Sequence, residues 1–220
     1  MKKLLVLFLS LLLCGCVTFN EDASKQGLNE VFKKDEDKID YRQNNTTYYF
    51  DYYLPSDMSE VSFSDENVIL NYSNSRLVMN VNIAGIISNQ YYIEGIRDDG
   101  FFDENALYFS KVGNYLDVNN RYIDYLFNIY NQDDYFLLHL LSNKVNIYAF
   151  SYKGEEVETA RHMLLLAKGT SVKDERILAN YSTKDVVNHQ RQQVDLFQYV
   201  IPKSGYLVDL IKDNENINSQ

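Results

Sequence analysis

The order of two hydrophobic periodicities constrains the fold of this chain more than any other feature. Between residues 46 and 152, short apolar runs alternate with polar turns. In one run, Leu77, Met79, Val81 and Ile83 fall on one face of an extended chain. Such period-two alternation is typical of a half-buried strand. The runs predict strands at residues 46–54, 61–63, 68–72, 76–87, 106–112, 121–130, 135–141 and 144–152.

A helical period replaces this alternation after Gly154. One helical face carries Val157, Ala160, Leu164 and Ala167, and Gly169 is a residue type at which helices often stop. Further helical segments are expected at residues 173–180, from 182 to Pro202, and at 205–212. Strands first and helices last predict an α+β fold: a single antiparallel sheet of hairpins and a meander, with C-terminal helices packed on one face.

The first sixteen residues have the anatomy of an export signal. Lys2 and Lys3 precede an apolar run from Leu4 to Leu13, which is too short to cross a bilayer that needs about twenty residues. Leu13-Cys14-Gly15-Cys16 follows and resembles the bacterial lipobox, with an unusual Cys in its second position. An ordinary secretory signal or an uncleaved N-terminal helix are the alternatives, but neither requires a Cys at position 16.

The lipobox resemblance implies a specific modification. The Cys16 thiol would receive a diacylglyceryl group, and a peptidase would cut between Gly15 and Cys16. Two acyl chains anchor stably, since each buried CH₂ contributes about 0.8 kcal/mol. The expected location is the outer face of the cell membrane, or the outer membrane in a two-membrane cell. Val17 stands where an Asp would suggest inner-membrane retention.

Composition then divides the full chain into expected regions. Residues 1–15 are the signal peptide, 16–45 a polar tether, 46–212 one globular domain, and 213–220 a disordered tail. The chain has 2 Cys, and both lie in the lipobox. After lipidation of Cys16 no thiol remains for a disulfide, for metal binding or for catalysis.

The net charge limits the classes of partner that the chain is expected to bind. The formal net charge is −10, and removal of Lys2 and Lys3 makes the mature chain more negative still. This argues against nucleic acid, which requires clustered Lys and Arg, and against a basic face lying on anionic lipid. The expected partners are the membrane, through the lipid on Cys16, and an envelope protein or glycan.

Candidate chemistry is sparse. Asp98, Asp99, Asp103 and Glu104 surround Gly100 and form the best carboxylate cluster, a weak candidate for Ca²⁺ because the spacing is not that of an EF-hand loop. His139 is expected in the core of an apolar strand, and His162 and His189 on exposed helix faces. No zinc, P-loop or nucleophile-elbow motif is present, and no cofactor is expected.

Tyrosines suggest a binding role, because exposed aromatic rings can stack on sugars. Tyr48, Tyr49, Tyr52 and Tyr53 flank the first strand, and Tyr91 and Tyr92 follow another. Alternation would equally place such residues partly in the core. The leading hypothesis is a non-enzymatic binding or envelope-organising module. The alternative is a carboxylate-dependent hydrolase of a wall polymer or peptide, with Asp98, Asp103 and Glu104 as its acids. A transporter's solute-binding component fits poorly, since strands and helices do not alternate.

Overall fold

A computed structural model describes residues 19–33, 42–88 and 104–181 of the chain. Its helices are α2 (Glu21–Phe32), α3 (Ile83–Ser88), α4 (Glu156–Lys168) and α5 (Asp174–Tyr181), with a 3-10 turn η2 at Glu104–Ala106. Its strands are β1 (Asn45–Thr46), β2 (Phe50–Tyr52), β3 (Met58–Phe63), β4 (Asn67–Tyr72), β5 (Ser75–Val81), β6 (Leu107–Leu116), β7 (Tyr122–Gln132), β8 (Tyr135–Ser142), β9 (Val145–Tyr152) and β10 (Ser171–Val172). The helices expected at 182–202 and 205–212, and the tail 213–220, lie outside the described residues.

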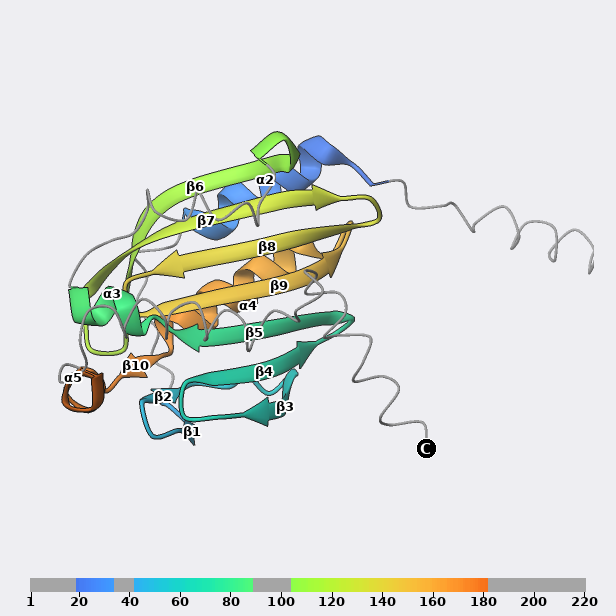
Figure 1. The fold of residues 1–220 in the computed structure, drawn as a ribbon. Helices are drawn as coiled ribbons and strands as arrows, with labels where there is room; N and C mark the ends of the chain where they lie inside the picture. The colour runs from blue at the N-terminus through green and yellow to red at the C-terminus, as the bar shows by residue number, and fades with distance from the viewer. Residues whose placement is uncertain (1–18, 34–41, 89–103, 182–220) are drawn as a thin grey trace, which may run out of the picture.

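A seven-stranded antiparallel sheet dominates the fold, in the order β3-β4-β5-β9-β8-β7-β6 (Figure 1). It consists of two meanders, β3 to β5 and β6 to β9, each with short turns between consecutive strands. The two meet where β5 pairs with β9, from Arg76 opposite Phe150 to Val81 opposite Val145. The predicted α+β class and antiparallel pairing are therefore confirmed.

The prediction of a single sheet is wrong, because three short strands form a second sheet in the order β1-β2-β10. The segment expected as one strand at 46–54 turns back on itself, and Asn45 pairs with Tyr52. The other edge of β2 pairs with β10, so that Phe50 lies opposite Val172. This last pairing joins residues far apart in the sequence, which local alternation cannot reveal.

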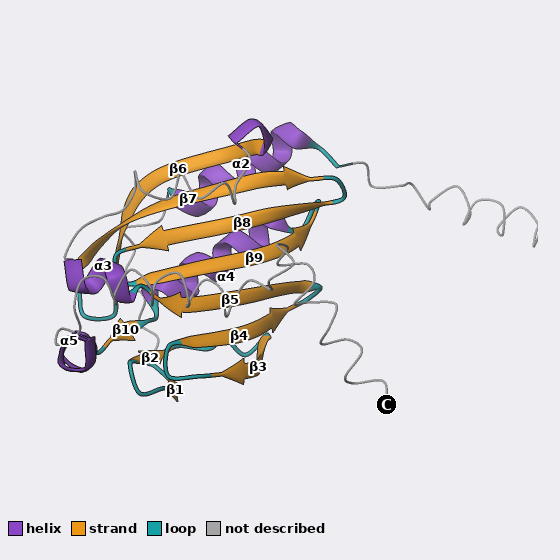
Figure 2. Ribbon diagram, viewed as in Figure 1, coloured by secondary structure: helices purple, strands orange, loops and turns teal. Residues whose placement is uncertain are grey.

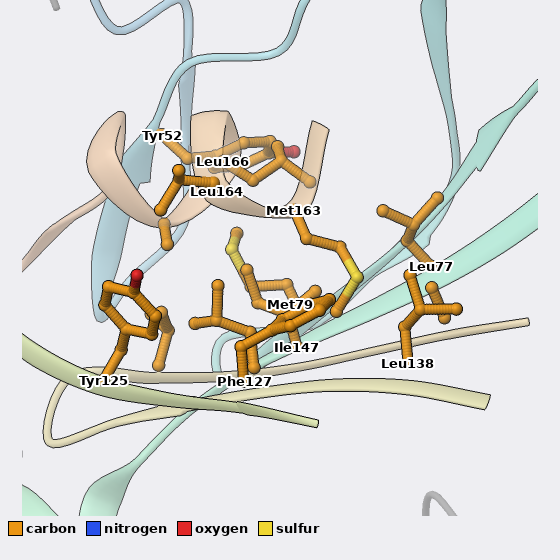
Figure 3. Packing of buried hydrophobic residues seen from close by; sticks show 14 of the residues in the cluster. Tyr52, Leu77, Met79, Tyr125, Phe127, Leu138, Ile147, Met163, Leu164 and Leu166 are labelled. Carbon is orange, nitrogen blue, oxygen red and sulfur yellow. The ribbon is translucent and has the colours of Figure 1, made fainter. Parts of the chain in front are cut away.

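The main core lies between the large sheet and two helices. Figure 2 shows α2 and α4 on the same side of this sheet. In Figure 3, Met163 of α4 points toward the strands that carry Met79 and Ile147. These three side chains and Leu166 of α4 are fully buried. Each such side chain stabilises the fold by roughly 1.5–3 kcal/mol through removal of apolar surface from water.

Helix α2 lies in the segment that was expected to be a polar tether, residues 16–45. Asn20 caps it, because its side-chain oxygen accepts a hydrogen bond from the Ala23 amide at 3.0 Å. Leu28, Val31 and Phe32 share one face and are buried in the core. The average polarity of this charged segment does not reveal such a narrow apolar stripe. The described fold therefore includes residues before position 46, with α2 packed into its core.

Helix α3 replaces the second half of the strand predicted at 76–87. Strand β5 ends at Val81, and the Asn82 side-chain oxygen accepts a hydrogen bond from the Gly85 amide at 2.9 Å. This is an N-terminal cap, which favours a helix over continued extension. The Asn82 amide also donates to the Ser142 carbonyl at 2.8 Å, so the cap is held against the β8–β9 turn.

The two ends of the large sheet carry different elements. Gln132 pairs with Tyr135 and Tyr135 with Tyr152 at one end, which we call the Phe19 end because α2 starts beside it. Leu116 pairs with Tyr122 at the opposite end. Helix α5 is fastened to this opposite end by an ion pair between Lys144 and Asp174.

Candidate binding site

The most distinctive exposed group lies on the hairpin between β1 and β2. Tyr48 is 45% exposed, although it is a large aromatic residue. The Arg176 guanidinium of α5 lies 5.1 Å from the centre of the Tyr48 ring. Arg176 also donates a hydrogen bond to the Tyr48 carbonyl at 2.9 Å. The hairpin and the helix therefore hold one phenol and one guanidinium together at the surface.

A second tyrosine layer supports Tyr48. The Tyr49 ring meets Tyr48 edge-on at 4.9 Å and lies 6.0 Å from Tyr181. The Tyr49 hydroxyl accepts a hydrogen bond from the Asn180 amide at 2.9 Å. Tyr49 and Tyr181 are both buried, so they fix the position of Tyr48. Burial, then a hydrogen bond to the Glu66 carboxylate, raises the pKa of Tyr181 above its ordinary value.

Beside Tyr48, charged groups are paired. The Lys173 ammonium lies 2.7 Å from the Asp51 carboxylate and donates to the Thr47 carbonyl at 2.8 Å. Burial alone would raise the pKa of Asp51, but hydrogen bonds from Lys173 and Thr46 outweigh it and lower that pKa. We call Tyr48, Arg176 and the Lys173–Asp51 pair the Tyr48 surface.

The Tyr48 surface has the chemistry of a contact site. Tyr and Arg are enriched among residues that dominate binding energy at protein interfaces. A tyrosine ring also offers an apolar face and a hydroxyl, which suits a sugar as well as a protein. Its carboxylate, Asp51, is paired with the Lys173 ammonium. An exposed ring beside a fixed guanidinium is an arrangement that suits binding.

The other tyrosines of the first group do not follow a two-residue alternation, because the segment turns back on itself between β1 and β2. Tyr52 is 1% exposed, and its hydroxyl donates to the Glu60 carboxylate. Burial, reinforced by this bond, raises the pKa of Tyr52. Tyr52 is thus a core residue, and only Tyr48 of the first tyrosine group is prominently exposed. Tyr91 and Tyr92 lie outside the described residues.

His139 is a core residue, as expected. It is 1% exposed, stacks on Tyr148 with ring centres 4.5 Å apart, and lies 3.3 Å from the Asn146 side-chain oxygen. Burial lowers the pKa of His139 to about 4, against a smaller opposing effect of the Asn146 hydrogen bond. The residue is neutral at neutral pH.

The prediction that His162 lies on an exposed helix face is wrong. The side chain is buried between α4 and the turn before β3, and its ring stacks on Tyr72 at 3.7 Å. Its Nδ1 donates to the Glu158 carbonyl at 2.8 Å, and its Nε2 lies 3.0 Å from the Asp57 carboxylate. Both nitrogens are engaged, so His162 fastens the turn to the helix. His189 lies outside the described residues.

The remaining predicted site residues lie largely outside the described part of the chain. This holds for Gly15 and Cys16, and for Asp98, Asp99 and Asp103 of the acidic cluster, whereas Glu104 begins η2. Among the described residues, no group of three His, Cys, Asp or Glu side chains is placed to hold a metal ion. No helix in this described part is both long and apolar enough to span a bilayer.

Comparisons with known proteins assign this chain to no family. No protein-family model matches it. A search of curated protein sequences finds no significant match either.

Proposed function

We propose that this chain is a bacterial surface lipoprotein, anchored through Cys16, whose domain binds an envelope protein or glycan without catalysing a reaction. The single observation that supports the anchor is the lipobox-like Leu13-Cys14-Gly15-Cys16 directly after an apolar leader. The mature domain would lie on the outer face of the cell membrane, or on the outer membrane of a two-membrane cell. Its negative charge disfavours nucleic acid as a partner.

The Tyr48 surface is the proposed contact site of this module. It combines an exposed ring with a guanidinium held by a hydrogen bond, so little conformational entropy is lost when a partner binds. The buried Tyr49 and Tyr181 rings below it resist displacement. A fixed aromatic and cationic pair is the arrangement that protein and sugar partners both exploit.

The anchor is tested by the Cys16→Ala substitution in the native host. The variant should stay unprocessed or leave the membrane fraction, because the acyl chains supply the membrane affinity. Cys14→Ala is the matched control, since alanine is a small residue at the same motif and should mature normally. A Cys16→Ala protein that matures and fractionates with membranes would remove the anchor proposal.

The contact site is tested by cross-linking and affinity capture from intact cells that carry Tyr48→Ala or Arg176→Ala. Loss of either hot-spot side chain should reduce recovery of the partner by roughly tenfold, as about 1.4 kcal/mol would. Tyr122→Ala is the control, because Tyr122 is 64% exposed and belongs to β7. Equal recovery with all three variants would contradict a role for the Tyr48 surface.

The hydrolase alternative stays a prediction. Its proposed acids are Asp98, Asp103 and Glu104, two of which lie outside the described residues. Turnover of a wall polymer or peptide by the purified mature chain, abolished by substitution of these carboxylates, would replace the binding proposal.

A further inference from the structure

The distance between the proposed lipid and the folded domain is set by very few residues. Only Val17 and Thr18 separate Cys16 from Phe19, where the described structure begins. A fully extended chain gains at most about 3.6 Å per residue, so Phe19 lies within about 11 Å of the Cys16 backbone. The expected tether of residues 16–45 would have given far greater reach.

Phe19 is itself fixed to one end of the large sheet. Its ring lies 5.6 Å from Phe136 and 6.3 Å from Tyr108, near the starts of β8 and β6. Helix α2 follows at once, and the Ser24 hydroxyl donates to the buried Glu156 carboxylate of α4. The start of the domain is therefore held to the Phe19 end by packing and by a buried hydrogen bond.

The Phe19 end carries side chains that suit a lipid headgroup layer. Phe19, Leu107 and Tyr152 are 37%, 46% and 56% exposed. Two lysines lie over aromatic rings there, Lys25 over Tyr108 and Lys153 over Phe136. Aromatic residues and snorkelling lysines are typical of the membrane–water interface.

Charge at this end does not itself attract an anionic membrane. Glu21 and Asp22 occupy the first turn of α2, and Asp133 and Asp134 form the β7–β8 turn. These four carboxylates outnumber Lys25 and Lys153. The proximity to the bilayer therefore comes from the short covalent connection, and it requires the anchor.

We infer that the Phe19 end of the sheet faces the lipid headgroup layer in the anchored protein, and that the Tyr48 surface points away from it. This rests on the proposed lipidation of Cys16. The 11 residues of β7 separate the two ends by about 35 Å, at roughly 3.3 Å per residue. Helix α5, which carries Arg176, is tied to the opposite end through Asp174 and Lys144.

The orientation can be measured with single-tryptophan variants, because the chain contains no Trp. The mature chain from Cys16 has one thiol, which can be coupled to a maleimide phospholipid in phosphatidylcholine vesicles. Nitroxide on the headgroups of a second lipid then quenches nearby tryptophan. Phe19→Trp and Tyr152→Trp report the Phe19 end, and Tyr122→Trp is the matched reporter at the opposite end.

Quenching at Phe19→Trp and Tyr152→Trp should exceed that at Tyr122→Trp at least about twofold, because the headgroup layer is thin beside the length of the sheet. Equal quenching, or stronger quenching at Tyr122→Trp, would overturn the orientation. Thermal melts check that each variant folds, and two reporters at the Phe19 end protect against the failure of one.

A lengthened connection isolates the cause. About twenty Gly and Ser residues inserted between Thr18 and Phe19 span roughly 25 Å and should abolish the difference between the ends. Unchanged quenching at Phe19→Trp would contradict a short-tether mechanism. Because coupling imposes the anchor chemically, failure here refutes the orientation alone, whereas fractionation of Cys16→Ala refutes the lipoprotein proposal.

Discussion

At the residue scale, buried polar groups on α4 are satisfied by specific partners. The Thr159 hydroxyl lies 3.1 Å from the Ser75 hydroxyl and 3.0 Å from that of Ser151, and it donates to the Glu155 carbonyl. One side chain thereby connects β5, β9 and its own helix. Such networks stabilise only when every member is paired, since an unpaired buried polar group costs about 1–3 kcal/mol.

The Ser24→Ala substitution should destabilise the domain by about 1.5–3 kcal/mol, the usual value of a hydrogen bond to a charged group. It removes the hydroxyl that donates to Glu156, a carboxylate only 1% exposed, and leaves that group with the Gly154 amide. Urea unfolding measures the loss. Ser110→Ala is the control, because its hydroxyl is exposed and should change stability little. Equal effects would contradict a buried link between α2 and α4.

His139 should make stability fall between pH 6.5 and about 4. Burial lowers the pKa of His139 in the folded protein to about 4, whereas the ordinary value is 6.5. In this window the unfolded chain binds a proton that the folded protein excludes. The contribution of neutral His139 to the free energy of unfolding is therefore fully present above pH 6.5 and is lost as the pH falls. The full effect is about 3 kcal/mol.

Unfolding free energies of the native protein and of His139→Gln, measured from pH 7 to pH 4, test this dependence. Carboxylates contribute equally to both proteins, so the difference in slope reports His139. The glutamine keeps an amide near Asn146 and cannot take up a proton. Parallel pH profiles would show that His139 does not cause the loss.

At the scale of elements, the sequence predicts strands whose residues alternate between polar and apolar. It does not predict pairings between segments that lie far apart in the chain. Strands β6 to β9 lie within a few residues of their predicted ranges, because each exposes one polar face or follows a sharp turn. The β2–β10 pairing and the contact of Arg176 with Tyr48 join segments more than a hundred residues apart. No local pattern contains such information, so the sequence does not reveal that Arg176 lies beside Tyr48.

Helix α2 should prove essential to the domain. Leu28 is fully buried, so Leu28→Ala should cost about 2–5 kcal/mol through lost burial and the cavity it leaves. Leu178→Ala on α5 is the matched control, since Leu178 is 39% exposed. Urea unfolding of both variants measures the contrast. A chain that starts at residue 46 and unfolds at the same urea concentration as the full mature chain would refute this role.

At the scale of the whole molecule, the proposed anchor and the net charge would act against each other. If Cys16 is lipidated as we propose, only Val17 and Thr18 separate the lipid from Phe19, and the membrane would set which end of the domain is presented outward. With the Phe19 end inward, the Tyr48 surface would be open to the proposed envelope partner. The excess of carboxylates would oppose close approach to an anionic bilayer, and the short connection would have to overcome that repulsion.

The same excess charge should make the isolated domain more stable in salt. Its net charge, −10 for the full chain, repels itself in the compact state, and salt screens that repulsion. Among the described residues, few ion pairs join different elements, such as Lys144–Asp174 and Lys173–Asp51, so we expect their weakening in salt to be the smaller effect. Raising NaCl from low to physiological and higher concentration should raise Tm by about 2–4 °C per kcal/mol gained. Calorimetry in NaCl measures this, because sulfate would also strengthen apolar burial. A Tm that falls with NaCl would mean that specific ion pairs outweigh the overall repulsion.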